Sequence, residues 1–285
     1  MSQVLKHARS FLFVPATRLD RLIKAFNSGA EAVVVDLEDA VDPASKETAR
    51  VALAQSLSNL ECDQLTRLVV RINAVDTPWH QADLIAMTPI FSQGQGAVML
   101  PKTEVPETIQ QVAAQLGPNG WVLPLIESLA GLDAVNSLVR ESRVLRLAFG
   151  HLDFQLDLGM KCHPDEPELD GVRFALVAAS RRACLPAPID SITADIGNAE
   201  RLAFDTARAR ALGFGGKLCI HPSQANIVNQ GFLPSAGEVN WARKVLAMAA
   251  RTGAEAFSLD ARMVDKPVIR MAEKILSAAA CQLNS

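Results

Sequence analysis

The sequence has no uninterrupted apolar run of about 18 residues, the length at which a membrane-spanning helix becomes a candidate. Its amino-terminal segment, MSQVLKHARS, also lacks the apolar core of a secretory signal. We therefore expect a cytoplasmic protein that has no membrane partner.

The sequence also lacks an excess of charge of one sign. It has 28 Lys and Arg against 31 Asp and Glu, a formal net charge of −3. A nucleic-acid-binding domain usually shows a clear basic excess. With 49% hydrophobic residues, the chain instead has the composition of a folded domain with a large core and no nucleic-acid partner.

Closely spaced cysteines are absent as well. The chain has five, an odd number, and no two form a C-x-x-C pair of the kind that binds zinc or performs thiol redox chemistry. Widely separated cysteines of this kind are typical of ordinary thiols in a reducing compartment.

What the sequence does contain is a repeated alternation of short apolar runs and helical patterns. Runs rich in β-branched residues recur about every 25 to 35 residues, the size of a βαβ unit. We count eight, at residues 10–14, 32–38, 68–73, 96–101, 121–127, 145–150, 187–194 and 216–222. Asp42 and Pro43 are typical of the start of one intervening helix, and Gly29 of the end of another.

This alternation predicts an α/β fold of the TIM type, a (β/α)8 barrel, over residues 1–230. An open, doubly wound sheet is the competing architecture. From residue 231 to 285 the pattern changes to two helical stretches around a strand-like turn, which predicts a carboxy-terminal helical extension. No linker rich in Gly, Ser and Pro supports an independent second domain.

Charged residues follow nearly every predicted strand, at the end of a barrel where catalysis takes place. Glu127 and Asp153 follow neighbouring strands, and no His or Cys lies at ligand spacing from them. Two carboxylates of this kind suit a hard cation, of which Mg²⁺ fits best. Such an ion leaves positions open for a hydroxy or keto carboxylate. The alternative is that both carboxylates cap helices or form structural ion pairs.

An arginine inside an apolar strand needs an anion to face, so Arg71 is a candidate substrate ligand. Its alternative role is a buried salt bridge to Asp36 or Glu38. Glu38 and Asp39, in the segment DLEDAV, are candidates for hydrogen bonding to metal-bound water, and capping of a helix is an equal alternative for Asp39.

With these residues in place, the sequence resembles the citrate lyase beta-subunit-like family of CoA-ester lyases, within the HpcH/HpaI aldolase superfamily. Citramalyl-CoA and malyl-CoA lyases belong to this family. The resemblance rests on eight segments in order, FLFVPATRLDRLIKA, AVVVDLEDAVDPASKETAR, VVRINAVDTPW, LPLIES, FGHLDFQLDLG, APIDSI, GFGGKLCIHPSQ and MVDKPVIRMAEKIL, which together span nearly the whole chain.

The resemblance implies that Glu127 and Asp153 hold Mg²⁺ and that Arg71 contacts the substrate. It implies that the segment containing Asp36, Glu38 and Asp39 lines the water shell of the metal. It further implies roles for two groups of residues outside the strand ends. Arg18, Arg21 and Lys24 would help to hold the substrate or the CoA phosphates, and Asp265 would act as an acid/base that reaches the site of a neighbouring subunit.

The extension would then be a lid supplied in trans, so the resemblance implies a homo-oligomer, a trimer or hexamer. The implied activity is Mg-dependent cleavage of a 3-hydroxyacyl-CoA thioester to an acyl-CoA and a 2-keto acid. Two alternatives stay open, an aldolase that acts on free 2-keto acids without CoA and a non-catalytic subunit of a lyase assembly. Ala16 and Leu152 depart from the family pattern, which often has Gly and Glu at these positions.

Overall fold

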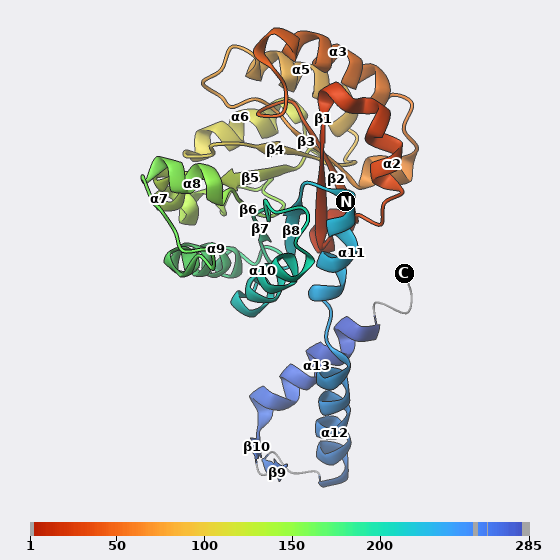
Figure 1. Ribbon diagram of the computed structural model, residues 1–285, viewed down its shortest axis with the longest axis vertical. Coiled ribbons are helices and arrows are strands. Elements are labelled where there is room, and N and C mark those ends of the chain that lie inside the picture. The colour runs from red at the N-terminus through yellow and green to blue at the C-terminus, as the bar shows by residue number, and fades with distance from the viewer. Residues whose placement is uncertain (1–2, 253–255, 261, 281–285) are drawn as a thin grey trace. The chain divides into compact units, whose positions relative to one another are not determined.

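A closed barrel of eight parallel strands forms the first part of the computed structural model (Figure 1). The structure describes residues 3–252, 256–260 and 262–280. The strands pair in chain order and β8 closes onto β1, which confirms the predicted barrel and excludes the open sheet. They are β1 (Ser10–Pro15), β2 (Ala32–Asp36), β3 (Leu68–Arg71), β4 (Ala97–Leu100), β5 (Val122–Ile126), β6 (Ala148–Phe149), β7 (Ile189–Asp190) and β8 (Gly216–Cys219).

Helices surround the barrel because its strands are apolar on both faces. Residues of β2 to β5 are buried throughout, and those that point inward form one cluster with side chains of the remaining strands. The covering helices are α1 (Gln3–His7), α2 (Leu22–Phe26), α3 (Lys46–Leu57), α4 (Cys62–Thr66), α5 (His80–Phe91), α6 (Pro106–Leu116), α7 (Leu129–Leu138), α8 (His151–Asp157), α9 (Asp170–Arg182), α10 (Ala199–Leu212) and α11 (Pro222–Gly231).

One predicted helix start is confirmed. Asp42 accepts a hydrogen bond from the Ala44 amide at 2.9 Å, as expected of a cap, and opens the 3₁₀ helix η2 (Pro43–Ser45) before α3. The predicted helix after β1 is a 3₁₀ segment, η1 (Ala16–Arg21), followed by α2, and η1 itself has a kink at Arg18, which leaves helical torsion angles. A third 3₁₀ helix, η3 (Pro167–Leu169), precedes α9.

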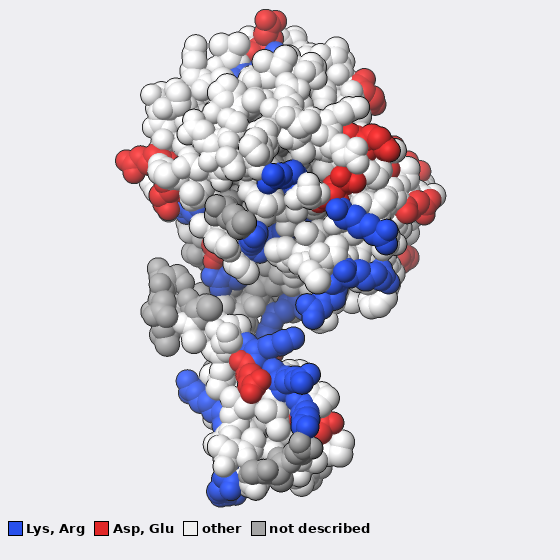
Figure 2. All heavy atoms as spheres, turned by 180° about the vertical axis from the view of Figure 1, so that it is seen from behind, with Lys and Arg blue, Asp and Glu red and all other residues white. Residues whose placement is uncertain are grey.

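The chain separates into two compact units, residues 1–229 and 230–285. The second unit is a helical hairpin, α12 (Ala236–Thr252) and α13 (Lys266–Ala280), joined by the antiparallel strands β9 (Phe257–Leu259) and β10 (Arg262–Val264). Its own small core contains Ala242, Val245, Val264 and Ala272. Acidic and basic side chains both appear on the face of each unit in Figure 2. Within the described residues, no helix has the length and apolar character needed to cross a membrane.

Candidate active site

A cavity of about 380 Å³ opens at the carboxyl ends of the barrel strands. Residues from the ends of seven strands line it, and Glu127 and Asp153 lie on it together with Asp36, Asp39 and Arg71. The structure therefore brings most of the predicted site residues to one place. This is the end of the barrel at which the fold positions catalytic groups.

Glu127 directly follows β5, so its carboxylate leaves an entirely buried strand and enters the cavity wall. The residue is 4% exposed, and its Oε1 accepts a hydrogen bond from the Lys102 amide at 2.8 Å. Burial, and then the nearby charge of Glu38, raise the pKa of Glu127 to about 8. A raised pKa shows that the protein supplies too little positive charge for this carboxylate.

The other oxygen of Glu127 lies against the backbone of Gly150. A Cβ atom at position 150 would lie 2.5 Å from Glu127 Oε2, closer than two such atoms can approach. Only glycine therefore leaves the room that the Glu127 carboxylate occupies. This close approach explains why a glycine stands between β6 and α8.

Asp153 lies in the first turn of α8 and lines the same cavity. Its negative charge contributes to the raised pKa of Glu127, so the two carboxylates interact. Across the described ranges the Asp153 carboxylate makes no hydrogen bond or ion pair. The charge of Asp153 also interacts with that of Lys102. Two interacting carboxylates, of which Glu127 is buried and Asp153 makes no hydrogen bond, fit a divalent cation.

A cation held here would have few protein ligands. Among the described residues, no group of three or more His, Cys, Asp or Glu side chains is arranged to bind a metal. Oxygen atoms of water or substrate would have to complete the coordination, as is common for Mg²⁺. The assignment of Glu127 and Asp153 as metal ligands stays a prediction.

Arg71 ends β3 next to Asp36 at the end of β2, and the register of the two parallel strands pairs these residues directly. Its Nε and Nη2 each lie 2.7 Å from an oxygen of Asp36, and its Nη1 lies 3.0 Å from Glu38 and 3.1 Å from Asp39. The salt bridge considered above is therefore present. The guanidinium also lies 5.1 Å from the ring of Phe13, where it borders the cavity.

The segment after β2 is held by a buried lysine. Lys46 Nζ donates to the carbonyls of Leu37 and Glu38 at 2.8 and 2.7 Å, and to Asn73 Oδ1 at 2.6 Å. Burial raises the pKa of Glu38 to about 7. The charge of Arg71 lowers this pKa, whereas the charges of Asp39 and Asp36 raise it. Lys46 thus holds the backbone of this loop in place, and Glu38 remains short of positive charge.

Three predicted substrate ligands lie away from this cavity. Arg18, Arg21 and Lys24 are exposed, and Arg18 forms an ion pair of 2.8 Å with exposed Asp20. None of them lines the cavity, and their predicted contact with CoA is untested. Asp265 belongs to the second unit, where its Oδ1 accepts a hydrogen bond from the Val268 amide, and its role also stays a prediction.

The two departures from the family pattern have visible consequences. Ala16 begins the 3₁₀ helix η1 and is not among the residues with positive φ, so the turn after β1 does not require glycine. Leu152 is 51% exposed and lines the cavity one residue before Asp153. An apolar side chain therefore stands where many family members have a carboxylate.

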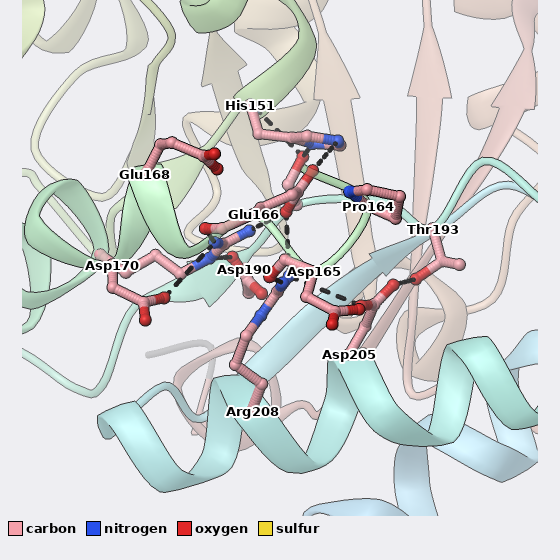
Figure 3. Close-up of polar contacts among 12 residues, drawn as sticks. His151, Pro164, Asp165, Glu166, Glu168, Asp170, Asp190, Thr193, Asp205 and Arg208 are labelled. Carbon is pink, nitrogen blue, oxygen red and sulfur yellow. Dashed lines mark hydrogen bonds and ion pairs between the residues drawn. The ribbon is translucent and has the colours of Figure 1, made fainter. Parts of the chain in front are cut away.

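A second polar cluster, which we call the β6–β8 network, joins residues that follow β6 to residues of β7 and the helices around it (Figure 3). We define it as His151, Glu166, Arg173, Asp190 and Arg208. Glu166 accepts hydrogen bonds from Arg173 at 2.5 Å and Arg208 at 2.9 Å, and lies 3.1 Å from His151 Nε2. Burial alone would raise the pKa of Glu166, but the hydrogen bonds and charges of His151 and Arg173 hold it well below the usual range.

Ser191 connects this network to the cavity, and no motif in the sequence predicts this link. Its hydroxyl contacts His151 Nδ1 and accepts a hydrogen bond from the His151 amide at 3.1 Å. That amide is the first of α8, so Ser191 satisfies an otherwise unpaired donor at the start of the helix that carries Asp153. Ser191 itself lines the cavity.

Comparison with known proteins gives a consistent result over nearly the whole chain. The HpcH/HpaI aldolase/citrate lyase family matches residues 9–222. A citrate lyase subunit beta-like protein of Deinococcus radiodurans is 34% identical over 281 residues, covering 95% of this chain and 97% of its own. A (3S)-malyl-CoA thioesterase of Cereibacter sphaeroides is 30% identical, covering 95% of this chain and 94% of its own.

A solved structure is similar over the same length. The crystal structure of protein CitE from Mycobacterium tuberculosis, in complex with magnesium, acetoacetate and coenzyme A, superposes with a TM-score of 0.84. It is 32% identical in sequence and covers 96% of this chain and 99% of its own.

Proposed function

Because this chain belongs to the HpcH/HpaI aldolase/citrate lyase family, we propose that it is a Mg²⁺-dependent carbon–carbon lyase. Its substrate would be a 3-hydroxyacyl-CoA thioester of the citramalyl-CoA, malyl-CoA or citryl-CoA type, cleaved to an acyl-CoA and a 2-keto acid. The observation that carries the proposal is the pair Glu127 and Asp153, which line one cavity. The nearby charges of Arg71 and Lys102 do not offset the burial of Glu127, whose pKa stays raised to about 8.

In the proposed reaction, Glu127 and Asp153 would hold Mg²⁺, which would supply Lewis-acid polarisation of the hydroxy-acid oxygens. The hydroxyl proton would pass to water as the hydroxyl becomes the keto carbonyl, and the electron pair of the broken carbon–carbon bond would pass to the thioester enolate. Asp265, protonated from solvent, would then supply a proton to the enolate carbon. General acid catalysis of this kind is typically worth about 10² to 10⁴-fold in rate.

Arg71 would stabilise the charge that develops on the keto-acid oxygen. Its Nε and Nη2 are committed to buried Asp36, whereas its Nη1 is shared between Glu38 and Asp39. The Asp39 side chain is 63% exposed and can move toward solvent. Nη1 is therefore the donor that a substrate oxygen would engage.

We propose that the second unit completes the site of a neighbouring copy, with Asp265 as the group supplied. The support is the family resemblance of the motif MVDKP and the placement of Asp265 at the start of α13, in a unit with its own core. The expected assembly is a homotrimer or hexamer.

The decisive experiment measures keto-acid release from a panel of CoA thioesters by the full-length protein. Activity should vanish with a chelator and return when Mg²⁺ is added. E127Q should lose about 10³-fold or more in rate, because the variant loses the electrostatic contribution of a bound metal. E107Q, at an exposed position in the first turn of α6, is the matched control and should keep full activity. Unchanged metal-dependent turnover in E127Q would exclude the proposal.

Hydrolysis is a second candidate, favoured by the (3S)-malyl-CoA thioesterase among the relatives. The same panel separates the two reactions. Hydrolysis releases free CoA thiol and leaves the hydroxy acid whole, whereas cleavage releases a keto acid and keeps the thioester. An aldolase without CoA would show no stabilisation by acetyl-CoA in thermal unfolding, and a non-catalytic subunit would show neither product when purified alone.

A further inference from the structure

A second cavity, of about 440 Å³, lies at the end of the barrel opposite the candidate active site. Its lining residues come from the segments that precede β1, β6, β7 and β8, whereas the proposed metal ligands follow β5 and β6. The lining includes Lys6, His7, Arg146, Cys184, Leu185 and Gly215. None of the lining residues that the structure describes is acidic, so two cations, Lys6 and Arg146, border the cavity without a carboxylate on its wall.

Arg146 is 1% exposed, and backbone carbonyls hold its guanidinium in place. Its Nε donates to the carbonyl of Ala187 at 2.8 Å, and its Nη1 donates to those of Leu5 and Ala8 at 3.2 and 2.7 Å. Its Nη2 donates to the carbonyl of Pro188 at 3.5 Å, the longest of these hydrogen bonds. A guanidinium has five N–H donors, two of them on Nη2. Nη2 is therefore the nitrogen that can still donate to a ligand.

These carbonyls satisfy N–H groups of Arg146 but do not cancel its charge. Within the described part of the chain, no carboxylate forms an ion pair with Arg146. Glu31, whose charge attracts Arg146, is itself bonded to Arg9 Nε at 2.8 Å. Burial lowers the pKa of Arg146 to about 9 in spite of that attraction. A buried charge without a counter-charge is costly, so an anion in the adjoining cavity would be stabilised.

The wall of the cavity leaves little bulk beside Nη2. Gly215 lines the cavity, and a Cβ atom at this position would lie 3.2 Å from Arg146 Nη2 and 2.9 Å from the Cβ atom of Ala187. A side chain at position 215 would therefore crowd the guanidinium. Lys6, whose ammonium lies 5.7 Å from the ring of Trp121, adds a second positive charge to the lining.

We propose that this cavity is a binding site for a small oxyanion, which accepts a hydrogen bond from Arg146 Nη2 and balances the charge of that residue. A phosphate group fits better than a carboxylate, because it carries close to two negative charges near neutral pH and two cations border the cavity. The site lies at the opposite end of the barrel from Glu127 and Asp153 and does not depend on the proposed function.

Two exposed cysteines allow the location of a bound anion to be measured. Cys184 lines the cavity, whereas Cys62 begins α4 and does not line it. The full-length protein would be alkylated with iodoacetamide, an uncharged reagent, and the rate at each cysteine followed by mass spectrometry. Inorganic phosphate at constant ionic strength should slow the modification of Cys184 and leave that of Cys62 unchanged. Equal rates at Cys184 with and without phosphate would overturn the proposed site.

A matched pair of variants at position 184 tests the role of charge. Cys184 has a φ of +56°, a conformation that Asn and Asp adopt more readily than most residues. C184N and C184D have nearly the same shape and differ by one negative charge at the cavity. Calorimetry should show that C184N binds phosphate like the unmodified protein and that C184D binds it at least about tenfold more weakly, because like charges then meet in the site.

Equal phosphate affinities of C184N and C184D would overturn the proposal, as would the absence of phosphate binding to the unmodified protein. Acetate, titrated in the same way, distinguishes a carboxylate ligand from a phosphate ligand. Phosphate should bind more tightly than acetate, and the reverse order would overturn the preference for a phosphate group.

Discussion

The two charged clusters at the carboxyl end of the barrel differ in how they are neutralised. In the β6–β8 network, Glu166 is surrounded by His151, Arg173 and Arg208, and its pKa lies below the usual range. At the cavity mouth, the pKa values of Glu38 and Glu127 are raised to about 7 and about 8. The positive charge around Glu166 is enough to offset its burial, whereas Arg71 and Lys102 do not offset the burial of Glu38 and Glu127.

This difference separates structural charge from functional charge. A buried carboxylate that is paired and hydrogen-bonded stabilises the fold, and removing one partner is costly. A buried carboxylate with a raised pKa destabilises the metal-free protein, and such carboxylates are concentrated at functional sites. The β6–β8 network therefore has the charge balance of a structural cluster, and Glu127 has that of the metal ligand we propose.

The largest effect on activity is expected when Glu127 and Asp265 are each replaced, in separate copies of the chain. E127Q and D265N should each be nearly inactive alone. If Asp265 acts in trans, mixed oligomers contain sites with an intact Glu127 from one copy and an intact Asp265 from the other. Random equal mixing should restore about a quarter of full activity. No recovery after co-refolding would show that Asp265 does not act in trans.

A smaller effect is expected when the room beside Glu127 is filled. G150A places a Cβ atom against Glu127 Oε2 and must displace the carboxylate. Mg²⁺ affinity, measured by calorimetry, should fall by about 10 to 100-fold. G171A is the matched control, because a Cβ atom at Gly171 in α9 would meet no atom within 4 Å. Equal metal affinity in both variants would contradict the role given to Gly150.

The two glutamates should respond oppositely to neutralisation in the metal-free protein. E166Q should lower the free energy of unfolding by about 2 to 3 kcal/mol at pH 7, since it weakens charge-assisted hydrogen bonds. E127Q should leave this free energy unchanged or raise it. Thermal unfolding in the presence of a chelator measures both, and a loss of stability in E127Q as large as that in E166Q would remove the distinction between the clusters.

The contributions of Glu166 and Glu127 to the free energy of unfolding should also change in opposite directions with pH. The lowered pKa of Glu166 gives stability that is present above the ordinary pKa of glutamate, about 4.5, and is lost as the pH falls further. The raised pKa of Glu127 means that the metal-free protein loses stability as the pH rises from about 4.5 to about 8. The free energy of unfolding should therefore fall less steeply between about pH 4.5 and about pH 8 in E127Q than in the unmodified protein. In E166Q the decrease over this pH range should be the same as in the unmodified protein.

The smallest effect is expected at Ser191, which acts on Asp153 only through the start of α8. S191A should weaken Mg²⁺ binding by about tenfold, which is the smaller end of the effect expected when a residue that orients a metal ligand is removed. S191T keeps the hydroxyl and should restore much of the affinity. A purely structural role would lower the unfolding temperature of S191A without changing metal affinity. Parallel calorimetry and thermal unfolding distinguish the two.

Much of the fold was predictable because the strands are continuous apolar runs with a regular spacing. All eight appear where the sequence places them, although β6 and β7 are only two residues long in the structure. The kink inside η1 was not predictable, since Arg18 leaves helical torsion angles and is itself neither glycine nor proline.

The candidate site was predictable where residues follow strands and not where they come from loops. Glu127, Asp153 and Arg71 end or follow strands, and a barrel brings such residues together. Glu166 comes from the irregular segment before η3, and its contact with His151 depends on the tertiary fold. The backbone amide of Lys102 and the space at Gly150 likewise carry no side-chain signal in the sequence.

Anomalous diffraction from crystals of the full-length protein containing Mn²⁺ in place of Mg²⁺ would locate the proposed metal site. We expect one strong peak at the cavity, within coordination distance of the carboxylates of Glu127 and Asp153, which disappears in E127Q. A peak at another group of residues, or one that persists unchanged in E127Q, would show that these two carboxylates do not hold the metal.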